Sequence, residues 1–248
     1  RILDRVGLEP RHLACGYHEP SDPESLAAVR AQPGEQSPLY NNCSGKHAGM
    51  LCLARSEGWP IEGYERADHP VQRLMRETVA DCCGVSPDSL ETGIDGCSVV
   101  VFGVPLAAMA TGYARLARAR EGGDARSRAL ARIAGAMIAH PVATDGVGRF
   151  STALMQAVPG RLIAKGGAEG LQCLSLTDRG LGLAVKCEDG AARPVAPAVV
   201  ALLDHLELIP PDAGPKLEAW RRPAIHNVAG LEAGAIEAVV RVPAPGAA

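Results

Sequence analysis

Aromatic residues are scarce in this chain, which has two Trp, four Tyr and two Phe among 248 residues. Because hydrophobic residues still make up 47% of the sequence, its core must be built from Ala, Leu and Val. Lys and Arg are scattered and the net charge is −3, so the sequence does not predict a nucleic-acid partner. No apolar run approaches the roughly 18 residues that a membrane-spanning helix needs, and we expect no membrane partner.

The sequence also lacks an initial methionine and a recognisable signal peptide. It begins with RILDRVGLEP, already in a helix-like pattern, so we expect that it starts inside a longer protein. Eight cysteines are present, but the chain is not small, and Cys82 and Cys83 are adjacent within an expected helix. This pattern favours reduced thiols in a cytoplasmic protein. We assign residues 1–248 to a single domain.

Hydrophobic periodicity predicts helices along most of the chain. They are expected near 23–30, 46–57, 70–83, 106–118, 125–140 and 196–206, with a shorter helix within 146–160. Asn42 or Ser44 is the expected N-cap of the second helix. Asp68 is the expected N-cap of the third, which Gly84 ends.

Strand patterns are concentrated in the last third of the chain. The apolar run in CSVVVFGVP, residues 97–105, predicts one buried strand before that region. Three strands are expected in 161–167, 171–177 and 180–189, with a tight turn at 178–180. A final strand is expected in 233–242. Helices followed by an antiparallel sheet predict the α+β class.

The stretch NNCSGKHAGM, residues 41–50, places a thiol, a hydroxyl, an amine and an imidazole within five positions. A phosphate-binding loop would need Gly where Tyr40 stands and Ser or Thr where His47 stands, which excludes that interpretation. Thiol catalysis by Cys43 and His47 stays open, since an imidazolium or a helix N-terminus lowers the pKa of a thiol.

A metal site would need ligands from elsewhere in the chain. The best candidate is GIDGCS, residues 93–98, where Cys97 lies between a turn at Asp95 and the expected strand. Two thiolates and one nitrogen ligand suit Zn²⁺ with one position left open. Spacing alone does not distinguish this site from two ordinary cysteines.

The stretch AKGGAEG, residues 164–170, places Lys165 at a strand end before two glycines. It resembles the Lys-Thr-Gly strand of penicillin-binding enzymes, where the Lys stabilises charge near a serine nucleophile. The alternative is a β-bulge or turn with a solvated Lys. A nucleophile of that class lies in Ser-x-x-Lys, and no serine in the chain has that spacing.

Three stretches in order, NNCSGKHAGML, DGCS and GRLIAKGGAEG, resemble the bacterial L-asparaginase II family of the inducible Rhizobium etli type. The stretches DHPVQR, GVGRF and VKCEDG are similar to the family as well, so the resemblance covers essentially the whole chain. The resemblance implies hydrolysis of L-asparagine to L-aspartate and ammonia. It also implies a fold like that of serine β-lactamases, an antiparallel sheet with packed helices, and a homodimer.

The resemblance further implies a site for Zn²⁺ beside the catalytic groups. The positions that match the zinc ligands are Cys43, Lys46 and Cys97. Asp95 and His47 match positions at the site, as contacts of the ligands or of the substrate, and Lys165 matches the lysine of a catalytic Ser–Lys pair. A lysine ligand is unusual because its amine must lose a proton, which a neighbouring dication makes possible.

Two departures from the family pattern bear on catalysis. The nucleophilic Ser-x-x-Lys and the serine partner of Lys165 would both lie upstream of Arg1, so we expect a fold that is incomplete at its N-terminus. Ser151 in GRFST stands where relatives usually carry Asp. Two alternatives therefore stay open: a zinc-binding domain whose catalysis has lapsed, and a related amidohydrolase or β-lactam-binding protein with another substrate.

Overall fold

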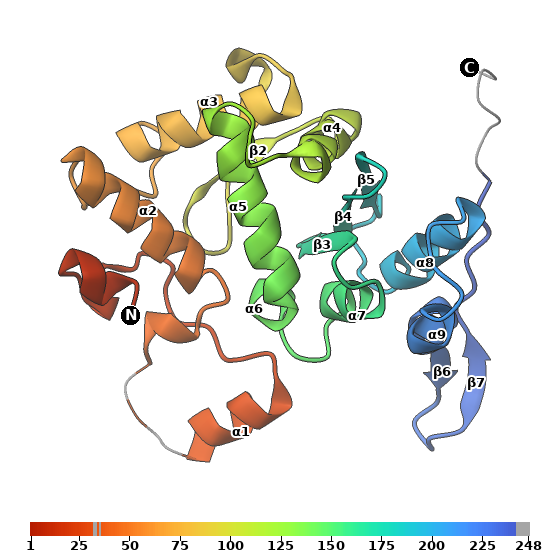
Figure 1. Cartoon of the computed structure of the whole chain (residues 1–248). Helices are drawn as coiled ribbons and strands as arrows, with labels where there is room; N and C mark the ends of the chain where they lie inside the picture. The colour runs from red at the N-terminus through yellow and green to blue at the C-terminus, as the bar shows by residue number, and fades with distance from the viewer. Residues whose placement is uncertain (32–33, 35, 242–248) are drawn as a thin grey trace. The chain divides into compact units, whose positions relative to one another are not determined.

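The computed structural model describes residues 1–31, 34 and 36–241 (Figure 1). It divides into two compact units, Arg1–Val104 and Pro105–Ala248, each of which we describe by itself. Both contain helices, and antiparallel strand pairs occur in both, so the predicted α+β class is confirmed. The assignment of the whole chain to one domain stays a prediction.

The first unit is mainly helical. Its elements are the 3-10 helices Leu3–Val6, Pro10–His12, Pro38–Tyr40 and Pro87–Ser89, the helices α1 (Pro23–Ala31), α2 (Ser44–Glu57) and α3 (Pro70–Cys83), and the strands β1 (Glu91–Ile94) and β2 (Val100–Gly103). A core of small aliphatic side chains, among them Leu3, Leu8 and Leu51, surrounds the buried Tyr64. Helices were predicted at all three α positions.

The N-terminus of α3 differs from the prediction. His69, not Asp68, is the N-cap: its backbone is extended, and its ring Nδ1 accepts a hydrogen bond from Val71 N at 3.2 Å. Asp68 lies one residue too early, because Pro70 fills the first helical position and has no N–H to offer. Gly84 ends the helix at φ 72°, as predicted.

The N-terminus of α2 also differs. Cys43 is the N-cap and makes no side-chain capping bond. The prediction that Asn42 or Ser44 caps this helix was therefore wrong. Gly58, one residue beyond the predicted end at 57, is the C-cap of the helix at φ 69°. The Cys43 thiol is therefore free of a capping role.

The only regular pairing described in the first unit joins β1 and β2 in an antiparallel hairpin, with Ile94 opposite Val100. Strand β2 lies inside the segment 97–105, where a strand was predicted. Only Val100 of this strand is buried, so the prediction of a buried strand was wrong for most of its length. Strand β1 was missed, because its sequence ETGI has no apolar run.

The second unit carries the larger sheet. Its helices are α4 (Leu106–Arg118), α5 (Ala125–Ala139), α6 (Pro141–Asp145), α7 (Phe150–Ala157), α8 (Val195–His205), the 3-10 helix Gly214–Leu217 and α9 (Glu218–Arg221). Its strands are β3 (Leu162–Gly167), β4 (Leu171–Leu176), β5 (Leu181–Lys186), β6 (Ala224–His226) and β7 (Glu232–Ala235). Strands β3, β4 and β5 form an antiparallel sheet in that order, which confirms the three predicted strands.

Helices cover both faces of this sheet. On one face, Leu162, Ala164 and Leu174 join a buried apolar cluster with residues of α7 and α8. On the other, α4 packs against β4 and β5, and Ser175 Oγ donates a hydrogen bond to Tyr113 O at 2.7 Å. Gly182 of β5 lies so close to the backbone of α4 that a Cβ there would overlap Ala110 O, so this helix contact requires glycine.

The final predicted strand, 233–242, was wrong in its extent. Strand β7 covers only Glu232–Ala235 and pairs with β6, a strand that the sequence did not predict, while 236–241 has no regular structure. Position 242 lies outside the described residues. No helix in the described ranges is long and apolar enough to span a membrane.

Candidate metal centre and substrate site

The loop between β1 and β2 fixes two of the predicted site residues. Asp95 N donates to Val99 O at 2.9 Å, and Ser98 N donates to Asp95 O at the same distance, which closes a tight turn. Ser98 adopts φ 73°, a conformation that is uncommon for residues other than glycine. Gly96 N donates to Asp95 Oδ1 at 2.9 Å. The turn thus places the side chains of Asp95 and Cys97 next to each other.

Asn41 positions the other cysteine. Its side chain is 6% exposed, its Nδ2 donates to Cys15 O at 2.8 Å, and its Oδ1 accepts from Cys43 N at 2.8 Å. The first turn of α2 follows at once, with His47 N donating to Cys43 O at 3.0 Å. A buried amide from the preceding loop therefore holds the N-cap residue in place.

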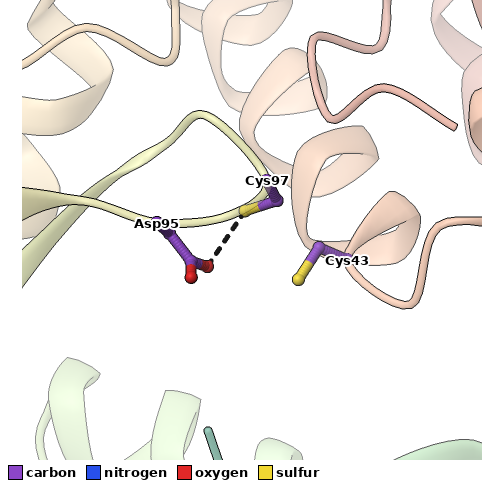
Figure 2. Close-up of side chains that lie close together, drawn as sticks. All are labelled: Cys43, Asp95 and Cys97. Atoms are coloured by element: carbon purple, nitrogen blue, oxygen red, sulfur yellow. Dashed lines mark hydrogen bonds between the residues drawn. The ribbon is translucent and has the colours of Figure 1, made fainter. Parts of the chain in front are cut away.

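The two segments meet in a cluster of thiols, a carboxylate and an amine. The possible ligand atoms of Cys43, Asp95 and Cys97 all lie within 4.8 Å of one another (Figure 2). Cys97 Sγ donates to Asp95 Oδ2 at 3.1 Å. Lys46 Nζ lies 3.3 Å from Asp95 Oδ2 and 3.3 Å from Cys97 Sγ. The structure thus brings together all three predicted zinc ligands and Asp95.

The electrostatics of the cluster favour a cation. Burial alone would lower the pKa of Lys46, but the Cys43 and Cys97 thiols and the Asp95 carboxylate outweigh it, so this pKa is raised. The hydrogen bond from Cys97, with Lys46, lowers the pKa of Asp95. Burial raises the pKa of the Cys97 thiol. The ammonium of Lys46 therefore balances the acidic groups in this structure.

The donor set fits a zinc ion. On a tetrahedral Zn²⁺ with Zn–S bonds of about 2.3 Å, two thiolates lie about 3.8 Å apart and a thiolate and an amine about 3.6 Å apart. In the structure the possible ligand atoms of Cys43, Asp95 and Cys97 lie within 4.8 Å of one another, and Lys46 Nζ lies 3.3 Å from Cys97 Sγ, so the distances are of the same order. Binding would release the Lys46 proton and any thiol protons.

His47 follows Lys46 in the first turn of α2 and is 0% exposed. Its Nδ1 is 2.6 Å from Tyr64 OH, and the two rings pack edge to face with centroids 5.5 Å apart. Burial, and then Lys46, lower the pKa of His47. Its Nε2 has no hydrogen-bond partner among the described residues. This burial places His47 as a support of the first turn of α2, and its contact with substrate stays a prediction.

Lys165 belongs to the second unit and lies within strand β3, which continues through Gly166 and Gly167. Its Nζ donates to Gly166 O at 2.6 Å and lies 3.4 Å from Asp145 Oδ1. Nearby, the buried side chains of Ser151 and Gln172 hydrogen-bond to each other at 3.2 to 3.3 Å. Ser151, which departs from the family pattern, is therefore satisfied by Gln172.

Several residues that shape these sites were missed from the sequence. They are Asn41, Tyr64, Asp145 and Gln172. The side-chain partners of Tyr64, Asp145 and Gln172 lie 17 to 21 positions away, and Asn41 reaches back 26 positions to Cys15. No local motif marks such contacts. Asn41 begins the stretch NNCSGKHAGM, but no role was predicted for it.

A comparison with protein families gives a match over most of the chain. A family model described as L-asparaginase II matches residues 1–238. A search among curated proteins finds no match. The matched range contains every residue of the cluster and Lys165.

Proposed function

Because this chain belongs to the L-asparaginase II family, we propose that it hydrolyses the side-chain amide of L-asparagine to L-aspartate and ammonia. The observation that carries the proposal is the convergence of Cys43, Lys46, Asp95 and Cys97, which come from segments about 50 positions apart. Such a group can hold a metal ion and present charge to a small zwitterion.

The substrate carries an ammonium and a carboxylate on its α-carbon. We propose that Asp95, whose side chain is 33% exposed, accepts hydrogen bonds from the substrate ammonium. Lys46, 39% exposed, lies beside it as the cationic group for the α-carboxylate when no metal is bound. A paired acid and base of this kind selects an α-amino acid over a simple amide.

The proposed reaction is an acyl transfer through a serine. The serine hydroxyl attacks the amide carbon, the C–N bond breaks, and ammonia leaves with a proton. Water then attacks the acyl ester, which releases aspartate and restores the serine. Lys165 would take the hydroxyl proton or stabilise the oxyanion. The 248 residues contain no Ser-x-x-Lys, so the nucleophile would have to come from another serine or from outside these residues.

We also propose that Cys43, Lys46 and Cys97 hold Zn²⁺, with Asp95 beside it. When bound, the ion would supply a Lewis acid with an open position for water or a substrate oxygen. The chain's own residues contribute the two thiolates and the amine. The turn at 95–99 and the buried amide of Asn41 hold the two thiols in place.

A fold related to serine β-lactamases belongs to the same proposal. It is supported by the position of Lys165 on the edge strand of an antiparallel sheet that helices cover on both faces. Location in the cytoplasm and assembly as a homodimer remain predictions.

The test is ammonia release from L-asparagine by the product of the complete gene and by its Lys165→Ala variant. We expect turnover by the first and a loss of at least about 100-fold in kcat by the second. No turnover of asparagine would refute the proposed reaction, with turnover of a β-lactam instead favouring another substrate.

The metal is tested separately by elemental analysis of purified protein. Cys43→Ser should lower zinc content sharply, while Cys52→Ser, in the same helix but outside the cluster, should not. Zinc bound without turnover would favour a domain whose catalysis has lapsed. Unchanged zinc in Cys43→Ser would refute the metal site.

A further inference from the structure

We propose that Asp145 is the positioning residue that holds Lys165 in place for catalysis. This inference rests on the proposed role of Lys165 in the reaction. Asp145 stands 20 positions before Lys165, at the end of α6, and its Oδ1 lies 3.4 Å from Lys165 Nζ. No motif in the sequence links the two residues.

The two side chains differ in their exposure. The Asp145 side chain is 11% exposed, whereas that of Lys165 is 44% exposed. The carboxylate is therefore the fixed member of the pair, and the ammonium is the member that reaches solvent. The second contact of Lys165 Nζ is with Gly166 O, at 2.6 Å. Two of the three ammonium donors are thus directed by the protein, and one stays available.

The segment that carries Asp145 is itself held firmly. Helix α6 ends at Gly146, whose N donates to Val142 O at 2.8 Å. Gly146 adopts φ 110°, which a residue with a side chain rarely adopts. The buried Thr152 Oγ1 bonds Gly146 O at 2.6 Å and Pro141 O at 3.2 Å, and so ties this turn to α7.

Asp145 is also the one acidic residue among the three side chains that lie around Gly166. A Cβ placed on Gly166 would lie 3.7 Å from Asp145 Oδ1, 3.7 Å from Ser151 Oγ and 3.5 Å from Gln172 Oε1. Ser151 and Gln172 are neutral and hydrogen-bond to each other. Of these three side chains around the strand, Asp145 alone can pair with an ammonium.

A lysine that acts on a serine must present its Nζ at one place. A half-exposed lysine has several rotatable bonds and would otherwise sample many positions. The fixed carboxylate restricts that freedom before substrate arrives. Because a misplacement of about 1 Å can cost about 100-fold in rate, a positioning residue of this kind affects kcat.

The first experiment needs no turnover. Trace acetylation of the full chain, followed by peptide mass spectrometry, measures the reactivity of each lysine at fixed pH. We expect Asp145→Asn to speed labelling of Lys165 about two- to fivefold, the range for partly exposed ion pairs. Lys186, which donates to Cys187 O, is the internal control and should not change. Unchanged labelling of Lys165 would overturn the inference.

The second experiment measures asparagine turnover by the product of the complete gene. Asp145→Asn should lower kcat about 10- to 100-fold with little change in KM, and Asp145→Glu should recover part of the loss. Asp178→Asn is the matched control, since it removes an ion pair with Arg161 (2.7 Å) that joins the start of β3 to the turn between β4 and β5, and it should keep kcat.

The two experiments separate the two proposals. A parent protein without turnover refutes the proposed reaction, and the labelling result alone then decides whether Asp145 holds Lys165. If the parent is active and Asp145→Asn keeps its kcat, the positioning role is wrong even though the reaction stands. An equal loss in Asp178→Asn would also overturn it, because the effect would then be structural.

Discussion

The substitution Tyr64→Phe, which removes one buried hydroxyl from the first unit, should destabilise that unit markedly. Tyr64 is 1% exposed, and its OH accepts a hydrogen bond from Ala14 N at 2.9 Å. The same OH lies 2.6 Å from His47 Nδ1 and is the hydrogen-bond partner of that nitrogen. The substitution leaves both groups without this partner, and an unsatisfied buried group costs about 1–3 kcal/mol. Because Ala14 is only half-buried, we expect a total loss of about 2–4 kcal/mol.

The same hydroxyl predicts an alkaline limit to stability. Burial raises the pKa of Tyr64 to about 12, from an ordinary value of 10.0. Between these values the unfolded chain loses the tyrosine proton while the folded chain keeps it, so stability falls as pH rises above about 10. The full difference amounts to about 2–3 kcal/mol. Tyr64→Phe should lack this contribution.

The assay is urea unfolding followed by the fluorescence of Trp59, which lies in the first unit, in a Trp220→Phe background. Tyr40→Phe, at a residue 45% exposed, serves as the control and should change stability by less than about 0.5 kcal/mol. An equal effect of the two substitutions, or the same fall above pH 10 in Tyr64→Phe as in the parent, would refute the reasoning.

Substitutions of Gly182, Ser175 and His69 test the packing of the second unit and the N-cap of α3. Gly182→Ala should destabilise the second unit by about 3 kcal/mol or more, because the added Cβ would overlap the α4 backbone. Gly135→Ala, on α5 with open space around it, is the control and should be neutral or stabilising by up to about 1 kcal/mol. Thermal unfolding compares the two variants. Ser175→Ala should cost about 1 kcal/mol by urea unfolding, because the buried hydrogen bond from Ser175 Oγ to Tyr113 O is lost. His69→Ala should lower the free energy of unfolding by about 1–2 kcal/mol because the N-cap of α3 is lost. His69→Asn, which keeps a capping side chain, should retain most of that stability, and an equal loss in the two variants would contradict the capping role.

The elements that the sequence predicted well are those whose signals are local. Helix α4 has the predicted bounds, and strands β3 to β5 follow the predicted pattern, because periodicity and turn residues act within a few positions. Strand β1 was missed because ETGI has no apolar alternation, and pairing with β2 is what orders it. The cap at His69 was misplaced by one residue, since the proline after it removes an N–H.

The site divides in the same way. Motifs located Cys43, Lys46, Cys97 and Lys165, because family resemblance reads residue type and spacing. The partners that orient those groups were not found. Tyr64 and Asp145 act through contacts to residues far along the chain, and either could be exchanged for other side chains without altering any motif.

Both lysines at these sites are paired with acids, but in different ways. Lys46 lies between Asp95 and Cys97, two residues of one tight turn. If Lys46 loses its proton, another cation in the same cluster must therefore balance these acidic groups. A dication at that place would balance them and would also keep the thiols deprotonated. Lys165 instead meets one carboxylate and a backbone oxygen, and its side chain is 44% exposed. The first arrangement suits exchange of a proton for a metal ion, and the second suits a lysine that keeps its position through a reaction.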